Sequence, residues 1–215
     1  MPSVPEPDKV AAHTPDHPLF AIEPRFRRAI EVGGPLPPLA VRPPNFGTLL
    51  RIILEQQVSV HTAETMWRRL AASCDPLEPA PFLALDDDTL QAFGFTRQKR
   101  SYARTLAAEI IAGRFDLGVL ATLPDAAARE MLVRQRGIGR WSAEVYLMFA
   151  LGRPDIWPAQ DLGLQLGVQA MLDLPTRPGP KELDAIAEPW RPHRTLAARL
   201  VWHLYLSARG RRHVG

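Results

Sequence analysis

The chain has 215 residues, of which 46% are hydrophobic and 23% charged, a composition typical of a soluble globular protein with one domain or two small ones. No segment approaches the roughly 18 apolar residues of a transmembrane helix, and the N-terminus does not resemble a signal peptide. The single cysteine, Cys74, excludes an internal disulfide, a multi-cysteine zinc site and a four-cysteine iron–sulfur cluster, and the formal net charge is +3.

The first 44 residues form a proline-rich arm that holds half of the 22 prolines. Residues 1–17 are expected to be mobile, whereas residues 24–33 can form a short helix that ends at Gly33 and Gly34. We expect the arm to be ordered in part against a helical domain that spans residues 45–215.

Helices are expected throughout this domain. Apolar residues recur at a spacing of three and four from Phe46 to Leu54, and Ser59 is a suitable N-cap for the helix that follows. The later helices are expected at residues 61–72, 86–94, 97–112, 125–136, 140–151, 162–172, 180–187 and 194–209. Alternating strand patterns are nearly absent, so the predicted fold class is all-α.

Two of the predicted helices are separated by the short sequence Gly137-Ile138-Gly139, which makes a hairpin over about residues 129–151. Backbone amides at the start of the second helix, together with the helix dipole, can bind an anion such as a phosphate. A glycine pair is also common in ordinary turns between helices, so the pattern alone leaves both interpretations open.

Basic residues cluster in three segments, 97–104, 129–140 and 191–212, and only three of the 26 basic residues are lysines. Clusters of this kind are typical of a protein that binds a polyanion. Each cluster by itself could equally be a solvated helix face, and a high-GC genome would also favour arginine over lysine.

Five segments, taken in order, resemble the 3-methyladenine DNA glycosylase II (alkylbase DNA glycosylase) family of the helix-hairpin-helix DNA glycosylase superfamily. The segments are LEQQVSV (54–60), GFTRQKRSY (94–102), GIGRWSAE (137–144), DIWPAQDL (155–162) and WRPHR (190–194). The resemblance covers about residues 46–206. It implies two helical lobes flanking a cleft, with no N-terminal β domain before the helical core.

Asp161 is the candidate catalytic residue. It lies where a loop ends and a helix begins, so it could serve only as an N-cap. The resemblance implies instead that it is the essential carboxylate of the family, which stabilises the positive charge that builds up on the sugar as the N-glycosidic bond breaks. Gln160 stands where many members carry a second acid, and Asp155 lies out of register.

The resemblance also implies roles in DNA binding. Gln57 aligns with the side chain that fills the gap left by an extruded base, although a glutamine here could also cap a helix. Gly137, Gly139, Arg140 and Ser142 align with the phosphate-binding hairpin. Trp141, Trp202 and Val145 align with the base pocket, where aromatic faces favour a cationic base, although either tryptophan could belong to the core. Val145 and His203 stand where some members carry tyrosine.

These assignments predict a monofunctional glycosylase that excises alkylated bases from double-stranded DNA. Trp141 occupies the position at which bifunctional members carry a lysine, so no lyase activity is expected. No cofactor or catalytic metal is expected, although members often hold a monovalent cation on carbonyls of the hairpin. We expect a monomer in the cytoplasm, associated with the nucleoid and not with membranes. The alternatives are a glycosylase of the same fold for deaminated or mismatched bases, and a non-catalytic DNA-binding module.

Overall fold

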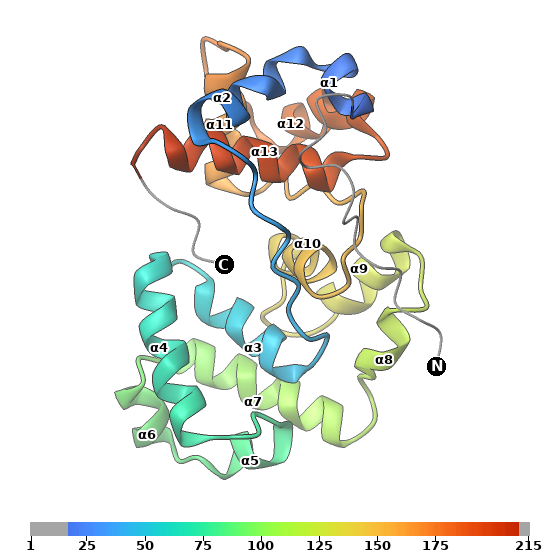
Figure 1. The fold of residues 1–215 in the computed structure, drawn as a ribbon. Helices are drawn as coiled ribbons and strands as arrows, with labels where there is room; N and C mark the ends of the chain where they lie inside the picture. Colours follow the sequence, from blue (N-terminus) through green and yellow to red (C-terminus); the bar gives the residue numbers. More distant parts are fainter. Residues whose placement is uncertain (1–16, 211–215) are drawn as a thin grey trace. The chain divides into compact units, whose positions relative to one another are not determined.

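The computed structural model of the chain describes residues 17–210, and every regular element in that range is a helix (Figure 1). This finding confirms the predicted all-α class. The expectation that residues 1–17 are mobile lies, except for His17, outside the described residues. None of the helices in the described part has both the length and the apolar character needed to cross a membrane. The chain divides into two compact units, of which unit 2 is Arg42–Leu151 and unit 1 contains the residues on either side of it.

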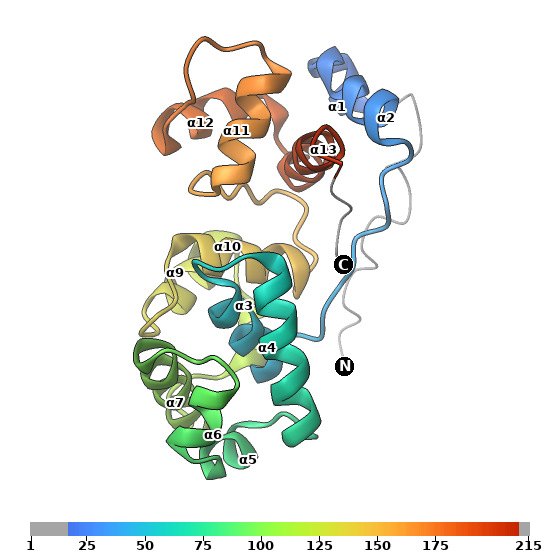
Figure 2. The same cartoon turned by 90° about the vertical axis from the view of Figure 1, so that its left-hand side faces the viewer.

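Unit 1 is organised around its last helix, α13, which packs between α11 and α2 (Figure 2). The described elements of unit 1 are α1 (Pro18–Ile22), a 3₁₀ helix (Pro24–Phe26), α2 (Arg27–Gly33), α11 (Leu162–Met171), α12 (Pro180–Ala187), a second 3₁₀ helix (Glu188–Trp190) and α13 (Arg194–Ser207). α1 was not predicted from the sequence, because its N-cap is His17, whose Nδ1 accepts a hydrogen bond from the backbone N–H of Leu19 at 3.1 Å. Histidine is not among the residues that usually signal a helix start.

Aromatic side chains fill the core of unit 1. The ring of Trp190 lies 4.9 Å from that of Phe26 and 5.3 Å from that of Trp157, and both pairs are T-shaped. The indole N–H of Trp157 donates a hydrogen bond to the Leu183 carbonyl at 3.1 Å. This bond satisfies the polar atom of a buried side chain, so that Trp157 anchors the loop between α10 and α11 in the core.

Unit 2 is organised around α3, which packs against α4, α7 and α10. Its elements are α3 (Phe46–Glu55), α4 (Val60–Ser73), α5 (Pro79–Ala84), α6 (Asp87–Ala92), α7 (Arg97–Ile111), α8 (Leu117–Leu120), α9 (Asp125–Val133) and α10 (Arg140–Phe149). α5 and α8 were not predicted from the sequence, because six and four residues are too few for a helical period to be recognised. Six apolar side chains of α3 are buried, which explains why its predicted pattern was clear.

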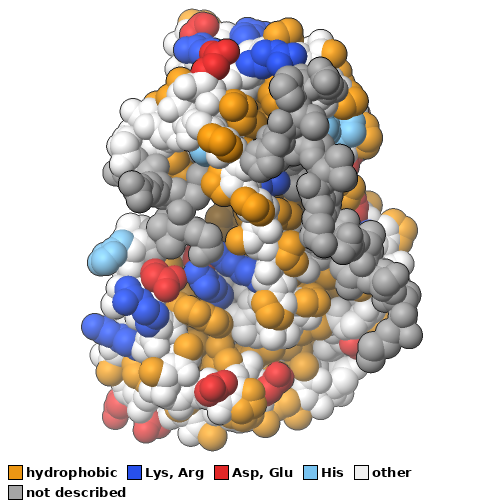
Figure 3. Space-filling model, in the orientation of Figure 1, with side chains coloured by type: hydrophobic (Ala, Val, Ile, Leu, Met, Phe, Trp, Pro, Cys, Tyr) orange, Lys and Arg blue, Asp and Glu red, His pale blue; other side chains and the backbone are white. Residues whose placement is uncertain are grey.

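Several arginines of the basic clusters are paired with acidic residues within the fold. Asp87 lies 3.5 Å from Arg100 and 2.9 Å from Arg104, and Glu144 lies 3.3 Å from Arg129 and 2.9 Å from Arg140. On the face drawn in Figure 3, basic, acidic and apolar side chains are interspersed. The clusters seen in the sequence therefore overstate the free positive charge. Their acidic partners either lie outside the cluster, as Asp87 does, or are outnumbered by neighbouring arginines, as Glu144 is.

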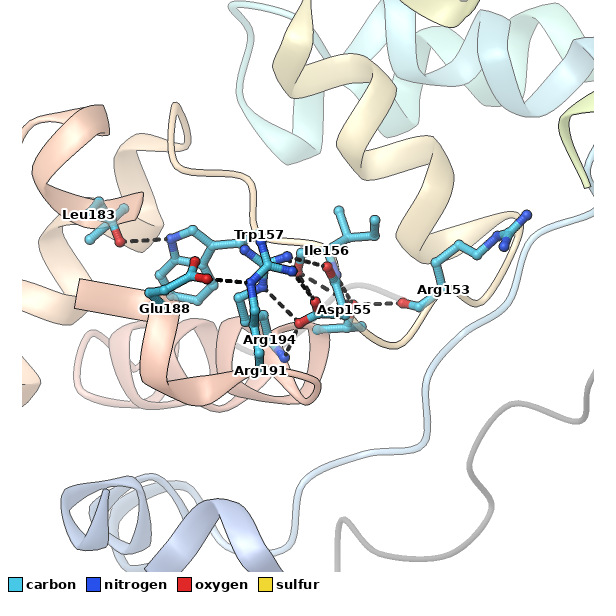
Figure 4. A network of polar contacts seen from close by, with 9 residues as sticks. Arg153, Asp155, Ile156, Trp157, Leu183, Glu188, Arg191 and Arg194 are labelled. Carbon is cyan, nitrogen blue, oxygen red and sulfur yellow. Dashed lines mark hydrogen bonds and ion pairs between the residues drawn. The ribbon is translucent and has the colours of Figure 1, made fainter. Parts of the chain in front are cut away.

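Asp155 fastens the loop that leads to Asp161 onto α13 (Figure 4). Its carboxylate accepts hydrogen bonds from Arg194 Nε at 2.7 Å and from Arg191 Nη1 at 2.7 Å. The next residue, Ile156, donates its backbone N–H to Thr195 Oγ1 at 3.0 Å. Because the side chains of Asp155 and Arg194 are only 16% and 11% exposed, this ion pair is shielded from solvent, and removing one partner costs more than at a surface pair.

We predict that the D155A substitution lowers the free energy of unfolding by about 3 kcal/mol, because it leaves the mostly buried guanidinium of Arg194 without its carboxylate. E188A is the matched control, because Glu188 pairs with Arg191 alone and is 64% exposed; we expect a change within about 0.5 kcal/mol. Urea unfolding followed by circular dichroism measures both. Equal losses in the two variants would contradict the role given to Asp155.

Candidate active site

Asp161 is the N-cap of α11, as the sequence allowed. Its Oδ1 accepts a hydrogen bond from the backbone N–H of Leu164 at 2.7 Å. The turn that precedes it is closed by a bond from Asp161 N to the Pro158 carbonyl at 2.8 Å, and Gln165 Nε2 donates to the Ala159 carbonyl at 2.9 Å. The position of the carboxylate is therefore set by both the helix and the loop that precedes it.

A second helix also holds this carboxylate. Trp202, on α13, donates its indole N–H to Asp161 Oδ1 at 2.9 Å. Gly163 leaves space beside the same oxygen, since a Cβ at that position would lie 3.1 Å from it. The structure thus brings together Asp161 and Trp202, to which the sequence analysis gave separate roles, and assigns the indole N–H to orienting the carboxylate.

The predicted hairpin is formed by α9 and α10 within unit 2. Gly137 has a φ of +89°, and a Cβ there would lie 2.3 Å from Tyr102 Cγ, so both the backbone conformation and the close approach require glycine. A Cβ on Gly139 would meet no atom within 4 Å, and Gly139, the N-cap of α10, has no side chain of its own with which to cap the helix. The first backbone N–H groups of a helix have no partner within the helix, and this is the geometry that favours an anion.

The two other hairpin candidates have protein partners. Arg140 donates its Nε to Glu144 at 2.9 Å, and Glu144 is fully buried between this arginine and Arg129. Ser142 is buried, and its Oγ is 2.9 Å from Gln56 Nε2. We therefore expect a phosphate to contact the backbone at Ser142 and not its hydroxyl, because the side chain is buried.

Gln57 lies in the loop between α3 and α4, which we call the Gln57 loop (residues 56–59). Gln56 is the C-cap of α3 and Ser59 is the N-cap of α4, where its Oγ accepts from the backbone N–H of Thr62 at 3.1 Å. The predicted cap Ser59 is thus confirmed, and Gln57 caps neither helix. Gln57 is exposed and adopts a φ of +56°, a conformation that residues other than glycine rarely adopt.

The three candidate pocket residues belong to different units. Trp141 and Val145 lie on α10 in unit 2, and Trp202 lies on α13 in unit 1. Trp141 and Trp202 are partly exposed, whereas Val145 is 6% exposed and offers little surface to a ligand. The assignment of all three to a base pocket stays a prediction.

The described residues contain no group of three His, Cys, Asp or Glu side chains arranged to hold a metal ion. The predicted monovalent cation would need carbonyls of the hairpin. The carbonyls of Gln135 and Gly139 accept backbone N–H groups from Ile138 and Ala143. Because a carbonyl oxygen has two lone pairs, these bonds are compatible with a cation, which stays a prediction.

Two residues that were not predicted from the sequence, Gln56 and Lys99, link the Gln57 loop and the end of α3 to other elements of unit 2. Gln56 Nε2 donates to the Gly137 carbonyl at 2.9 Å as well as to Ser142, and so joins the Gln57 loop to the hairpin. Lys99 donates to two carbonyls at the end of α3. Both residues lie inside the five motifs, but nothing in the local sequence indicates their partners, which lie more than 40 residues away.

Residues 50–192 match the family described as HhH-GPD superfamily base excision DNA repair protein. The YfjP protein of Bacillus subtilis is 27% identical over 166 residues, which cover 73% of this chain but only 58% of YfjP. The alkylbase DNA glycosidase-like protein mag2 of Schizosaccharomyces pombe is 25% identical, with 86% of this chain and 90% of mag2 covered. The solved structure of the 3-methyladenine DNA glycosylase Mag1 of S. pombe, in complex with abasic DNA, matches with a TM-score of 0.77 at 26% identity, covering 83% of this chain and 89% of Mag1.

We predict that G137A lowers the free energy of unfolding by about 2 kcal/mol or more, because alanine is strained at this φ and its Cβ would overlap the Tyr102 ring. G139A is the matched control two residues away, where the φ of −85° and the open space accept a Cβ. We expect a change within about 0.5 kcal/mol for G139A. Thermal unfolding of both variants tests the hairpin geometry, and a tolerated G137A would contradict it.

Proposed function

The chain belongs to the HhH-GPD superfamily of base excision DNA repair proteins, and we propose that it is a monofunctional DNA glycosylase that removes alkylated bases from double-stranded DNA. The observation that carries the proposal is the carboxylate of Asp161, which two N–H groups from two helices hold in one orientation. We also propose that it acts as a monomer in the cytoplasm, associated with the nucleoid.

The chemistry requires little beyond this carboxylate. Cleavage of an N-glycosidic bond develops positive charge on the sugar, as in other glycoside hydrolyses. A base alkylated as in 3-methyladenine or 7-methylguanine is itself cationic, so it leaves without a general acid. Asp161 stabilises the sugar cation and orients the attacking water, which is the electrostatic type of catalysis. At about 4 Å and an effective dielectric constant near 20, a carboxylate contributes about 4 kcal/mol, or about a thousandfold in rate.

The hairpin and the Gln57 loop serve DNA binding in this proposal. The N-terminus of α10, which follows Gly139, binds a phosphate through the backbone, which fixes the position of the protein on DNA without selecting a sequence. Gln57 is exposed and projects from a loop held by its neighbours, so it fills the gap in the base stack when the damaged base is extruded. Its amide can also form hydrogen bonds to the base left without a partner.

The names of two relatives support an alkylated substrate. Mag1 is described as a 3-methyladenine DNA glycosylase and mag2 as an alkylbase DNA glycosidase-like protein. A panel of duplexes, each with one damaged base, tests this assignment after alkaline cleavage at abasic sites. Release of 3-methyladenine or 7-methylguanine supports it. Release only of deaminated or mismatched bases would contradict the substrate class while preserving the glycosylase function.

We predict that D161N reduces base release about a thousandfold without weakening DNA binding. Asparagine keeps the Oδ1 acceptor for Leu164 and Trp202, and it caps helices as well as aspartate does, so the substitution removes the charge alone. D86N is the matched control, because Asp86 caps α6 through a bond of 2.6 Å from the backbone N–H of Thr89 and lies outside the site. Single-turnover base release and gel-shift titration measure the two effects. Retained activity in D161N would exclude Asp161 as the catalytic residue.

We further propose that the enzyme lacks abasic-site lyase activity. Trp141 occupies the position at which bifunctional relatives carry the lysine that forms a Schiff base, and an indole nitrogen is not a nucleophile of that kind. We predict that borohydride traps no covalent complex with DNA and that strands break only after alkali is added. The W141K variant is the companion test, in which a trapped complex would indicate that position 141 reaches the sugar. Trapping by the unaltered protein would contradict the proposal.

A further inference from the structure

The motif GFTRQKRSY (94–102), which contains the start of α7, has no role in the proposed function. Lys99, in this motif, is one of only three lysines in the chain. It is 8% exposed, which is unusual for a lysine, since lysines are almost never buried without a partner. Burial lowers the pKa of Lys99, because the ammonium loses its hydration. The contacts of the Lys99 ammonium must therefore offset the cost of burying it.

The ammonium of Lys99 contacts the end of α3. Its Nζ donates hydrogen bonds to the Leu54 carbonyl at 2.7 Å and to the Gln56 carbonyl at 2.8 Å. The last carbonyls of a helix lack partners within the helix and form the negative end of its dipole. Lys99 therefore satisfies both carbonyls with a charge of the favourable sign.

The contact with Gln56 also constrains the backbone at the next residue, Gln57. The peptide group between Gln56 and Gln57 is planar, so fixing the direction of the Gln56 carbonyl fixes the N–H of Gln57 as well. Gln57 then adopts a φ of +56°, which costs about 1 kcal/mol or more for a residue other than glycine. Such a conformation persists only when the surroundings impose it, and Lys99 is the part of the surroundings that holds the preceding carbonyl.

The same helix also supports the hairpin. Tyr102, one turn after Lys99, packs against Gly137, and the guanidinium of Arg136 lies 5.9 Å from the centre of its ring. On the other side, Gln56 bonds to Gly137 and Ser142. The start of α7 thus contacts the Gln57 loop through Lys99 and the phosphate-binding turn through Tyr102.

We propose that Lys99 is a positioning residue for base extrusion, and that its two hydrogen bonds hold the Gln57 loop in the conformation that inserts Gln57 into DNA. This inference rests on the proposed glycosylase function. Lys99 touches neither the base nor the sugar, and it acts through the backbone of Gln56. The alternative is a lysine that only stabilises the end of α3, and the two roles differ in how they depend on the base pair.

The test compares two duplexes with the same lesion, 7-methylguanine, placed opposite either cytosine or an abasic site. The unpaired lesion costs less to extrude, so it depends less on the inserted side chain. We expect K99M, which keeps the apolar stem but loses the donors, to lower the paired-to-unpaired ratio of single-turnover rates about tenfold. The ratio is independent of the fraction of folded protein, so a loss of stability alone does not change it.

K181M is the matched control, because Lys181 is exposed on α12, and we expect its ratio to equal that of the unaltered protein. If K99M does not fold, K99Q keeps one donor group at shorter reach and should lower the ratio in the same direction. Q57A, which removes the inserted side chain, should lower it as well. An unchanged ratio in K99M or K99Q, or in Q57A, would overturn the role of Lys99. Failure of the unaltered protein to release the lesion from either duplex would instead overturn the glycosylase function.

Discussion

The carboxylate of Asp161 has to keep one orientation, and unit 1 is arranged so that it does. Its Oδ1 is held by the first turn of α11 and by the indole N–H of Trp202 on α13. In the proposed mechanism, a carboxylate that is already oriented when charge develops on the sugar needs no reorganisation, which is why a single carboxylate would suffice. The bonds of Asp155 to Arg191 and Arg194 serve the same end, because they fix the loop before Asp161 to the start of α13.

Unit 2 holds an exposed polar side chain, that of Gln57, in a backbone conformation that is unfavourable by itself. Gln57 adopts a positive φ although it is not a glycine, and the contacts of neighbouring residues offset the cost of this conformation. Lys99 holds the carbonyl before it, and Gln56 connects the loop to the hairpin. If Gln57 inserts into DNA as we propose, a loop held in this way loses little conformational freedom on binding, so less of the binding free energy is spent on ordering it.

Much of this could be predicted from the sequence. The helices of unit 2 follow apolar spacing, and Ser59, Gly137 and Asp161 stand where their motifs and turn chemistry indicate. Short elements such as α5 and α8 could not be predicted, because they contain too few residues to show a period. The partners of Lys99 and Gln56 could not be predicted either, since a side-chain contact across more than 40 residues depends on how the helices pack. The pairing of Arg100 and Arg104 with Asp87 could not be predicted either, because it depends on how α6 packs against α7 although the residues are only 13 and 17 positions apart.

The dependence of Asp161 on Trp202 also has a consequence for biosynthesis. α13 is the last helix of the described chain, so a ribosome completes the hairpin, the Gln57 loop and Asp161 before it makes the residue that orients the carboxylate. Unit 2 is contiguous and can fold as soon as it emerges, whereas unit 1 needs segments from both sides of it. Under the proposed function, a nascent chain acquires its DNA-contacting surface first and its oriented carboxylate last, so that a prematurely terminated product would occupy DNA without acting on it.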